Sequence, residues 1–351
     1  MWNRGLEGME SKQNKDVTPL ISVIMSVYNE ERFLKEAIES IQKQTVQDWE
    51  LIVVDDGSTD RTRTILEEYT DPRIHVVFND ENRGLTANLN HALELTRGTY
   101  IARMDGDDIS HEDRFEKELI YLQTHPELML ISCRTETFGT VKLRSDVQGE
   151  PEYLRCRMLV RPVLAHPGFF VRGEVFRELG YRYDESFRQA QDYELAARLT
   201  RKYSIGVCPE VLLEYRAHEG QVSSKSGSSQ FVNADRVRTF LLRELGIELT
   251  EDEWKDYHCL VREDRIEDPE VFCRVMRIVN KILRQNQERS IYDQAVLKNA
   301  LGRIMSAWII RTKSKTLYCR VRMIFGGDRE YLAAYRREWI QLLGHKLRSK
   351  G

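Results

Sequence analysis

Short apolar runs alternate with helical patterns through the first 110 residues, and this alternation constrains the fold more than any other feature. The predicted strands are Leu20–Val27, Trp49–Val54, Arg73–Phe78 and Tyr100–Met104. Helical spacing of apolar side chains predicts three intervening helices over Glu30–Gln44, Asp60–Tyr69 and Gly84–Thr96. Such an alternation forms βαβ units, which build a mostly parallel sheet with helices on both faces. The sequence therefore predicts an α/β protein.

The alternation weakens after about Cys133. Residues 134–165 are expected to contain an irregular segment, whereas Phe169–Val171 is a strand candidate and Asp192–Thr200 a helix. Beyond the polar stretch Ser223–Ser229, nearly every segment has helical spacing: Asn233–Leu245, Glu251–Val261, Pro269–Gln285 and Tyr292–Ile310. We therefore expect a polar extension over residues 1–18, an α/β domain over 19–229 and a helical region over 230–351.

Charge is distributed unevenly along the chain. The formal net charge is −3, yet residues 301–351 contain 12 Lys or Arg against three Asp or Glu. Aromatic side chains accompany the bases in the tail 308–351, a combination found in helices that lie on anionic membranes. A packing helix with a solvated basic face explains the same pattern, so both interpretations stay open. The rest of the chain is acidic and contains no recognisable nucleic-acid-binding module, so we expect no nucleic-acid partner.

The start of the sequence and the cysteines bear on the cellular compartment. The first 17 residues lack the apolar run of a signal peptide, and no stretch of about 18 apolar residues predicts a membrane-spanning helix. Six cysteines are scattered without a Cys-x-x-Cys pair, which is typical of reduced thiols. We expect a cytoplasmic protein, either free or held at the inner face of the cell membrane by the basic tail.

Polar residues follow three of the predicted strands. These clusters are Tyr28-Asn29-Glu30, Asp55-Asp56-Gly57-Ser58 and Asp105-Gly106-Asp107-Asp108. Ligands of open α/β sheets bind beyond the carboxyl ends of the strands, so the three clusters together predict a nucleotide site. A turn followed by a helix N-cap is the alternative explanation for any one of them.

The last cluster places three carboxylates within four residues. Like charges this close raise one another's pKa unless a positive charge compensates them. Mg²⁺ or Mn²⁺ is the natural partner, because these hard cations prefer carboxylate oxygens and also bind substrate phosphates. Neither a Gly-x-x-x-x-Gly-Lys-Ser/Thr loop nor a Gly-x-Gly-x-x-Gly loop is present, which argues against a P-loop ATPase and a dinucleotide-binding enzyme.

These motifs resemble those of the family 2 glycosyltransferases, which have the GT-A fold: a Rossmann-like, mostly parallel sheet flanked by helices. The resemblance is carried by ISVIMSVYNEERFLKEAIESIQKQT at 21–45, ELIVVDDGSTDRT at 50–62, NRGLTANLNHAL at 82–93 and ARMDGDDIS at 102–110. It covers about Pro19 to Ser224, and the helical region lies outside it. The combination, order and spacing of these motifs are specific, whereas only the Asp-Gly-Asp-Asp segment would be specific alone.

On the donor side, the resemblance implies that Tyr28 and Glu30 border the nucleotide base and ribose. Asp55 would accept a hydrogen bond from the base, most often uracil in this family, and Asp56 would shape the pocket. The loop and helix start beside the donor would be formed by Asn82, Gly84 and Asn88. The family's Asp-x-Asp pair would be Asp105, facing the ribose or the metal, and Asp107, holding the cation at the diphosphate, with Asp108 assisting.

On the acceptor side, the resemblance implies contacts from His166 and Gln191, a general base at Asp192, and a metal or diphosphate contact from His218. The family usually has Glu where this chain has Gln191, so Glu194 is a competing carboxylate. A structural histidine at 166, an N-cap at Asp192 and a loop polar residue at 218 are the alternatives.

The resemblance implies an inverting, metal-dependent transferase that moves a sugar from a nucleotide-sugar, most often a UDP-sugar, to a hydroxyl of a glycan or lipid-linked glycan. A polyprenyl-phosphate glycosyltransferase of the same fold is one alternative, although the absent spanning helices and the acceptor-type half disfavour it. A catalytically silent nucleotide-sugar-binding protein is the other alternative. The identity of the donor sugar is not encoded in any of these motifs.

Overall fold

The computed structural model describes residues 18–139, 143–145, 147–218, 227–264 and 269–312. One eight-stranded sheet runs through the larger part of the molecule, in the order β3-β2-β1-β4-β7-β6-β8-β5. Its strands are β1 (Ile21–Val27), β2 (Trp49–Asp55), β3 (Ile74–Phe78), β4 (Tyr100–Asp105), β5 (Ile109–Ser110), β6 (Leu128–Gly139), β7 (Phe169–Arg172) and β8 (Ser204–Ala217). Strands β3, β2, β1 and β4 are parallel neighbours, β6 and β8 form a second parallel pair, and β7 runs antiparallel between the two groups.

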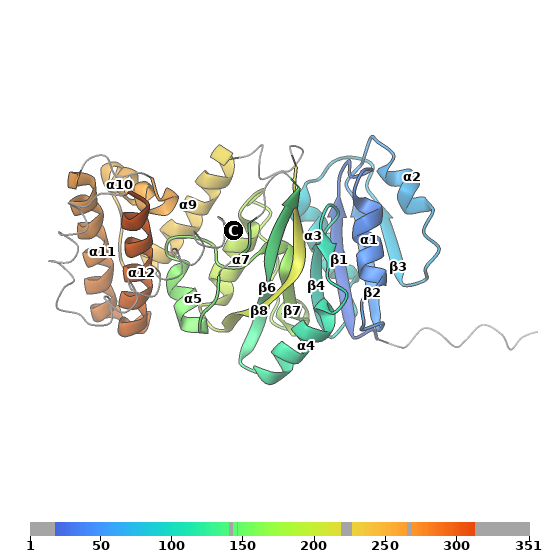
Figure 1. Cartoon of the computed structure of the whole chain (residues 1–351), viewed down its shortest axis with the longest axis horizontal. Coiled ribbons are helices and arrows are strands. Elements are labelled where there is room, and N and C mark those ends of the chain that lie inside the picture. Colours follow the sequence, from blue (N-terminus) through green and yellow to red (C-terminus); the bar gives the residue numbers. More distant parts are fainter. Residues whose placement is uncertain (1–17, 140–142, 146, 219–226, 265–268, 313–351) are drawn as a thin grey trace, which may run out of the picture.

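Helices cover both faces of the sheet (Figure 1). Those that precede the helical region are α1 (Leu34–Gln42), α2 (Thr62–Glu67), α3 (Leu85–Leu95), α4 (Arg114–Thr124), α5 (Pro151–Arg157), α6 (Glu174–Arg177) and α7 (Gln191–Leu199). Alternating side chains of β1 explain the two layers: Val23 and Met25 pack with α1 and α4, whereas Ile24 packs with α3. Both faces are buried, which is why the parallel strands are apolar almost throughout.

The predicted α/β architecture is confirmed, with the first four strands and three helices where the residue pattern places them. Strand Phe169–Val171 and helix Asp192–Thr200 correspond to β7 and α7. The expected irregular segment is confirmed for the described residues between Gly139 and Pro151, but the sequence did not predict that β6 continues to Gly139 or that α5 occupies Pro151–Arg157. In β6 the residues Arg134–Thr137, which follow Cys133, are polar and only partly buried, so the apolar pattern of a strand is lost there.

Four helices form the opposite end of the molecule from β3 (Figure 1). They are α9 (Gly227–Glu244), α10 (Glu251–Arg262), α11 (Pro269–Arg289) and α12 (Gln294–Thr312). One apolar cluster extends from Ile24 of the sheet, through α5 and α7, to Trp308 of α12. The boundary predicted near residue 230 therefore marks a change of composition, while the hydrophobic core continues across it.

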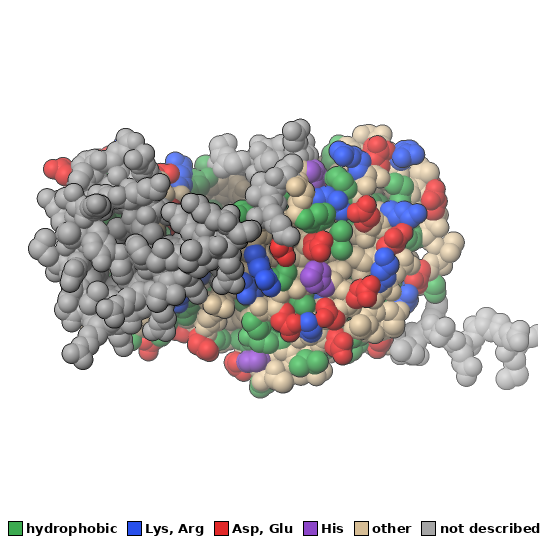
Figure 2. All heavy atoms as spheres, in the orientation of Figure 1, with side chains coloured by type: hydrophobic (Ala, Val, Ile, Leu, Met, Phe, Trp, Pro, Cys, Tyr) green, Lys and Arg blue, Asp and Glu red, His purple; other side chains and the backbone are tan. Residues whose placement is uncertain are grey.

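None of the helices in the described ranges is both long and apolar enough to cross a membrane. The described cysteines, which are Cys133, Cys156, Cys208, Cys259 and Cys273, are all free thiols, as the sequence predicts. Acidic and basic side chains are interspersed over the visible face around α1 and α2, without a large patch of one sign (Figure 2). The predicted basic tail lies mostly beyond Thr312, outside the described residues, whereas Trp308 is fully buried in the core.

Candidate active site

Three carboxylates gather where β4 ends. One oxygen from each of Asp105, Asp107 and Asp108 lies within 4.8 Å of the others. Gly106 allows this tight arrangement, because a Cβ atom there would lie 2.6 Å from Cγ1 of Val27 in the neighbouring strand. The acidic segment can therefore lie directly against the end of β1 only with glycine at this position.

Arg103 holds the first carboxylate in place. Its side chain is 4% exposed, and its guanidinium donates to both oxygens of Asp105, with Nη1 2.7 Å from Oδ2. Burial raises the pKa of Asp105, Arg103 opposes this rise and Asp107 adds to it, so that the pKa is about 6. We did not identify Arg103 from the sequence, although a charged residue inside an otherwise apolar strand was a usable signal.

The second carboxylate is paired with a histidine from the end of β8. Nε2 of His218 lies 3.0 Å from Oδ2 of Asp107, across 111 residues of sequence. The imidazole also packs against the ring of Phe33, with 4.9 Å between the ring centroids. The structure thus brings together two residues that the sequence analysis assigned separately to the metal side of the site.

Arg216 connects the acidic segment to β8 and α1. Its backbone N–H donates to Oδ1 of Asp108 at 2.9 Å, and its Nε donates to the carbonyl of Asp107 at 2.8 Å. Nη2 reaches Oε2 of Glu36 at 2.6 Å. The other oxygen of Asp108 is buried and has no hydrogen-bond partner among the described residues. Burial raises the pKa of Asp108 well above its usual value, and Asp105 and Asp107 add to the rise.

Glu30 brings a fourth carboxylate to this edge. Its backbone N–H donates to Oγ1 of Thr62 at 2.7 Å, which fixes the turn after β1. Burial and, to a smaller extent, the charges of Asp107 and then Asp105 together raise the pKa of Glu30 to about 8. Such a concentration of negative charge would be relieved by a bound cation.

The end of β2 supplies two carboxylates with different surroundings. Oδ1 of Asp55 accepts the N–H of Ser58 at 3.3 Å, but Oδ2 is buried without a partner among the described residues. Asp56 is fully engaged, since Oδ1 accepts the N–H of Arg83 at 2.7 Å and Oδ2 that of Gly84 at 2.9 Å. Asp56 therefore fixes the loop that leads into α3.

The remaining donor-side candidates border this loop. Asn79 donates to both Asp56 and Asn88, and Nδ2 of Asn88 in turn donates to Ser26 at the end of β1. Gly84 is the N-cap of α3 with φ 89° and ψ 155°, a conformation that favours glycine. Asn82 is exposed on the same loop, and Tyr28 is 45% exposed after β1.

Asp192 lies in the first turn of α7, which begins at Gln191 after the left-handed N-cap Ala190. Burial raises the pKa of Asp192, and the N–H of Tyr193 and the charge of Arg103 counteract the rise. Its charge in turn raises the pKa of Asp105, so the two carboxylates are close enough to interact. Oε1 of Gln191 is buried without a described partner.

Glu194 and His166 have structural partners. Both oxygens of Glu194 pair with Arg198 one helical turn later, so this carboxylate is already neutralised. His166 is buried, with Nε2 3.0 Å from the hydroxyl of Tyr183 and its ring edge-on to Phe169. Burial lowers the pKa of His166 well below its usual value, and the nearby Arg103 lowers it further.

Comparisons with known proteins identify the family of the chain. The glycosyl transferase family 2 model matches residues 22–180. An uncharacterised glycosyltransferase of Haemophilus influenzae is 30% identical over 249 residues, which are 66% of this chain and 77% of the relative. A putative teichuronic acid biosynthesis glycosyltransferase of Bacillus subtilis, TuaG, is 43% identical over 106 residues, which are 30% of this chain and 42% of that protein.

Two solved structures share the fold. Residues 1–349 of S. aureus TarS, in complex with UDP-GlcNAc, superpose with a TM-score of 0.55 at 17% identity and cover 92% of each chain. The Pyrobaculum calidifontis mannosyltransferase PcManGT, in complex with GDP-Man and Mn²⁺, has a TM-score of 0.51 at 17% identity and covers 83% of this chain and 88% of its own. The TarS similarity therefore extends beyond the α/β part into the helical region. The chain belongs to glycosyl transferase family 2 and is a glycosyltransferase.

Proposed function

We propose that this enzyme transfers a sugar from a UDP-sugar to a hydroxyl of a glycan or lipid-linked glycan, with inversion at the anomeric carbon. The observation that carries the proposal is the acidic cluster of Asp105, Asp107 and Asp108, paired through Asp107 with His218. It lies at the carboxyl ends of β1, β2 and β4, where nucleotides bind in open α/β sheets.

The same cluster fits a divalent cation. Its carboxylate oxygens are within 4.8 Å of one another, and the free buried oxygen of Asp108 would gain a partner. Asp107 and Asp108 would hold the ion with His218, while Asp105, already clamped by Arg103, would hold its outer side or the ribose. A bound Mn²⁺ or Mg²⁺ would neutralise charge on the departing diphosphate.

Asp192 is our proposed general base. It would take the proton of the acceptor hydroxyl as the hydroxyl oxygen attacks the anomeric carbon and the bond to the diphosphate oxygen breaks. One displacement of this kind inverts the configuration and releases UDP. The pairing of Glu194 with Arg198 supports Asp192, because it leaves Glu194 without a free carboxylate oxygen.

The proposed UDP specificity rests on Asp55. Its unpartnered buried oxygen is an acceptor that the N–H of a uracil would satisfy, and an unsatisfied buried acceptor is costly. TarS is bound to a UDP-sugar, whereas PcManGT is bound to a GDP-sugar, so the fold alone leaves the base open. Asp55→Asn should weaken UDP binding, because the amide loses the negative charge that strengthens the hydrogen bond.

Titration with UDP, GDP and dTDP, each with and without Mn²⁺, tests the nucleotide and the metal together. We expect Mn²⁺-dependent binding of UDP that is lost in Asp107→Ala and kept in Lys255→Ala, a matched exposed control on α10. Binding of GDP in preference to UDP would overturn the base assignment. Nucleotide binding that does not depend on Mn²⁺ would overturn the metal assignment.

For the acceptor, we propose a cell-surface polysaccharide that is built at the membrane and carries free hydroxyls. The relationship to TuaG supports this class of acceptor. The basic residues beyond Thr312 would hold the enzyme at an anionic surface. Co-sedimentation with phosphatidylglycerol vesicles should fall when residues 313–351 are removed, and unchanged co-sedimentation would reject membrane binding by the tail.

A further inference from the structure

Arg103 lies two residues before Asp105 on β4, so the two side chains project from the same face of the strand. Both terminal nitrogens of its guanidinium donate to the carboxylate of Asp105. We propose that Arg103 is a positioning residue: it directs Asp105 toward the ribose of the nucleotide and leaves the cation to Asp107 and Asp108. This inference rests on the proposed function and chooses between the two roles given to Asp105 there.

The ion pair between Arg103 and Asp105 is costly to bury. The side chain of Arg103 is 4% exposed, and its Nε is buried without a hydrogen-bond partner among the described residues. Desolvation of a buried pair offsets most of its attraction, so the pair adds little net stability. The guanidinium fork supplies direction instead, because two N–H bonds fix the plane of a carboxylate and a single point charge does not. Arg103 therefore sets the orientation of Asp105.

The remaining surface of Asp105 suits hydroxyl groups. A carboxylate accepts about four hydrogen bonds, and the fork of Arg103 occupies two of these positions. The side chain of Asp105 is 24% exposed, so it remains accessible to a ligand. The two adjacent hydroxyls of a ribose are donors that match the positions left over, and charged acceptors make the stronger hydrogen bonds.

The cation has better ligands beside Asp105. Oδ2 of Asp108 is buried and has no hydrogen-bond partner among the described residues. Oδ2 of Asp107 lies 3.0 Å from Nε2 of His218, which is itself a possible ligand. The charge of Asp105, in contrast, is already compensated by Arg103, and the like charge of the guanidinium opposes a cation bound directly there.

The neighbours of Arg103 on the acceptor side are neutral. Strand β4 pairs with β7 only as far as Ala102, and the 3₁₀-helix His166–Gly168 leads into β7. Burial and, to a smaller extent, the charge of Arg103 lower the pKa of His166 well below its usual value, so this imidazole is uncharged. Its Nε2 lies 3.0 Å from the hydroxyl of Tyr183. Neither side chain therefore competes with Arg103 for Asp105 as a positive charge.

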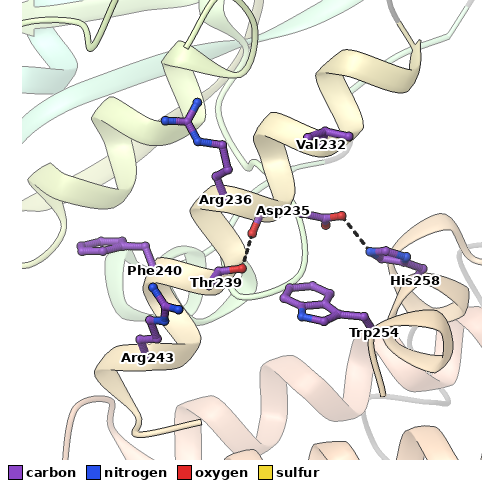
Figure 3. Close-up of a pocket in the computed structure, with 8 residues that line it drawn as sticks. All are labelled: Val232, Asp235, Arg236, Thr239, Phe240, Arg243, Trp254 and His258. Atoms are coloured by element: carbon purple, nitrogen blue, oxygen red, sulfur yellow. Dashed lines mark hydrogen bonds and ion pairs between the residues drawn. The ribbon is translucent and has the colours of Figure 1, made fainter. Parts of the chain in front are cut away.

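The segment that carries Tyr183 is held from two sides. Asn90 of α3 accepts the N–H of Tyr183 at 3.0 Å and donates to its carbonyl at 2.9 Å. Arg236 of α9 points away from His258 (Figure 3) and donates to the carbonyl and the hydroxyl of Ser186, each at 2.9 Å. These bonds keep the surroundings of the guanidinium in place, so the orientation of the fork is set before a nucleotide binds.

Binding of UDP and of dideoxy-UDP, the analogue without the two ribose hydroxyls, tests the proposal on the full chain with Mn²⁺ present. We expect the unmodified chain to bind UDP about tenfold more tightly, the size of a lost hydrogen bond to a charged group. Arg103→Met should bring this ratio close to unity. Arg103→Lys should give an intermediate ratio, since lysine keeps the charge without the fork. Isothermal titration calorimetry measures both affinities.

The ratio separates positioning from a general loss of charge, because both nucleotides carry the same diphosphate. Asp105→Ala should lower the ratio as Arg103→Met does, and the double variant should lower it no further, because Arg103 acts through Asp105. Turnover is a poorer readout, since burial raises the pKa of Asp192 and the charge of Arg103 is one of the influences that counteract the rise. Mn²⁺ alone, followed by electron paramagnetic resonance, should bind to Arg103→Met at least as tightly as to the unmodified chain.

Arg73→Met is the matched control. Arg73 also clamps an aspartate two residues away, Asp71, but lies before β3 at the opposite edge of the sheet, so the ratio should not change. Equal binding of both nucleotides by the unmodified chain, the full ratio in both Arg103 variants, or loss of Mn²⁺ binding in folded Arg103→Met would overturn the proposal. Should Arg103→Met not fold, Arg103→Lys decides alone.

Failure of the proposed function gives a different result. An unmodified chain that binds no UDP contradicts the proposed function, whichever form of residue 103 is present. A preference for GDP contradicts only the base assignment, and GDP with its dideoxy analogue then replaces the uridine pair, because the inference concerns the ribose.

Discussion

Asp192 and Glu194 are two carboxylates on one helical turn with very different surroundings. Glu194 is neutralised by Arg198, whereas Asp192 faces the charges of Arg103 and Asp105. Sequence alone left the choice between them open, because the family's preceding Glu is replaced by Gln191. Side-chain pairing distinguishes the two residues in a way that spacing along the chain does not.

Asp192→Asn should therefore lower kcat by a factor of about 10²–10⁴, the usual contribution of a general base, with UDP binding unchanged. Glu194→Gln should leave kcat within about twofold and lower the free energy of unfolding by about 1 kcal/mol, since it weakens a partly buried ion pair. UDP release and urea unfolding measure the two effects. A large loss of kcat in Glu194→Gln alone would reverse the assignment.

Substitution of two glycines by alanine tests why the donor side needs glycine at these positions. Ala at Gly106 would meet Val27 at 2.6 Å and displace the acidic segment, so UDP binding in the presence of Mn²⁺ should be lost. Ala at Gly84 meets nothing within 4 Å, and its cost is the strained backbone, about 1–3 kcal/mol of stability. Thermal unfolding and UDP titration of both variants check this contrast. Equal nucleotide binding in both variants would contradict it.

Among the strands and helices, the sequence predicts those whose side chains are buried in a regular pattern. Strands β1, β2 and β4 are apolar on both faces, so their sequences identify them. Strand β8 escaped prediction because Gly206, Pro209 and Glu210 interrupt it, and its pairing with β6 has irregularities near Cys133 and Arg134. The contact between His218 and Asp107 depends on the position of β8, so it could not be predicted from the sequence.

The turn between α2 and β3 gives a pH-dependent prediction. Nη2 of Arg73 lies 2.8 Å from Oδ2 of Asp71, and these bonds hold the pKa of the Asp71 carboxyl below its usual value. A lowered folded-state pKa stabilises the fold above about pH 4, and this contribution is lost as the pH falls further. Asp71→Asn should cost about 1 kcal/mol at pH 7 and progressively less below pH 4. Urea unfolding across this range measures it, and a constant difference would refute the explanation.

At the scale of the whole molecule, the sequence did not predict that the hydrophobic core of the sheet continues into the helical region. The spacing of apolar residues correctly predicted helices beyond residue 230. It did not predict that α12 packs against α5 and so joins the apolar cluster of the sheet. The reason is physical: periodicity reports which face of a helix is buried, and says nothing about which element covers that face.

Trp308 lies at the end of this core. Its side chain is fully buried, its ring centroid lies 6.2 Å from that of Phe272, and its indole N–H donates to the carbonyl of Asp264 at 2.7 Å. Trp308→Ala should cost about 3–5 kcal/mol. Circular dichroism and tryptophan fluorescence should still follow one shared unfolding transition. Two separate transitions in the unmodified chain would show that the helical region unfolds independently.

Strand β7 has a further consequence for recombining this enzyme with its relatives. It pairs on one side with Tyr100, Ile101 and Ala102 of β4 and on the other with Leu130, Ile131 and Ser132 of β6. A chimera that joins the part of one protein before β6 to the part of another from β6 onward therefore creates a new seam along β4 and β7. A crossover between α4 and β6 would also exchange Arg216 and His218, which contact Asp108 and Asp107. The donor half would therefore stay intact only if these two positions, together with the three β4 positions, match the incoming segment.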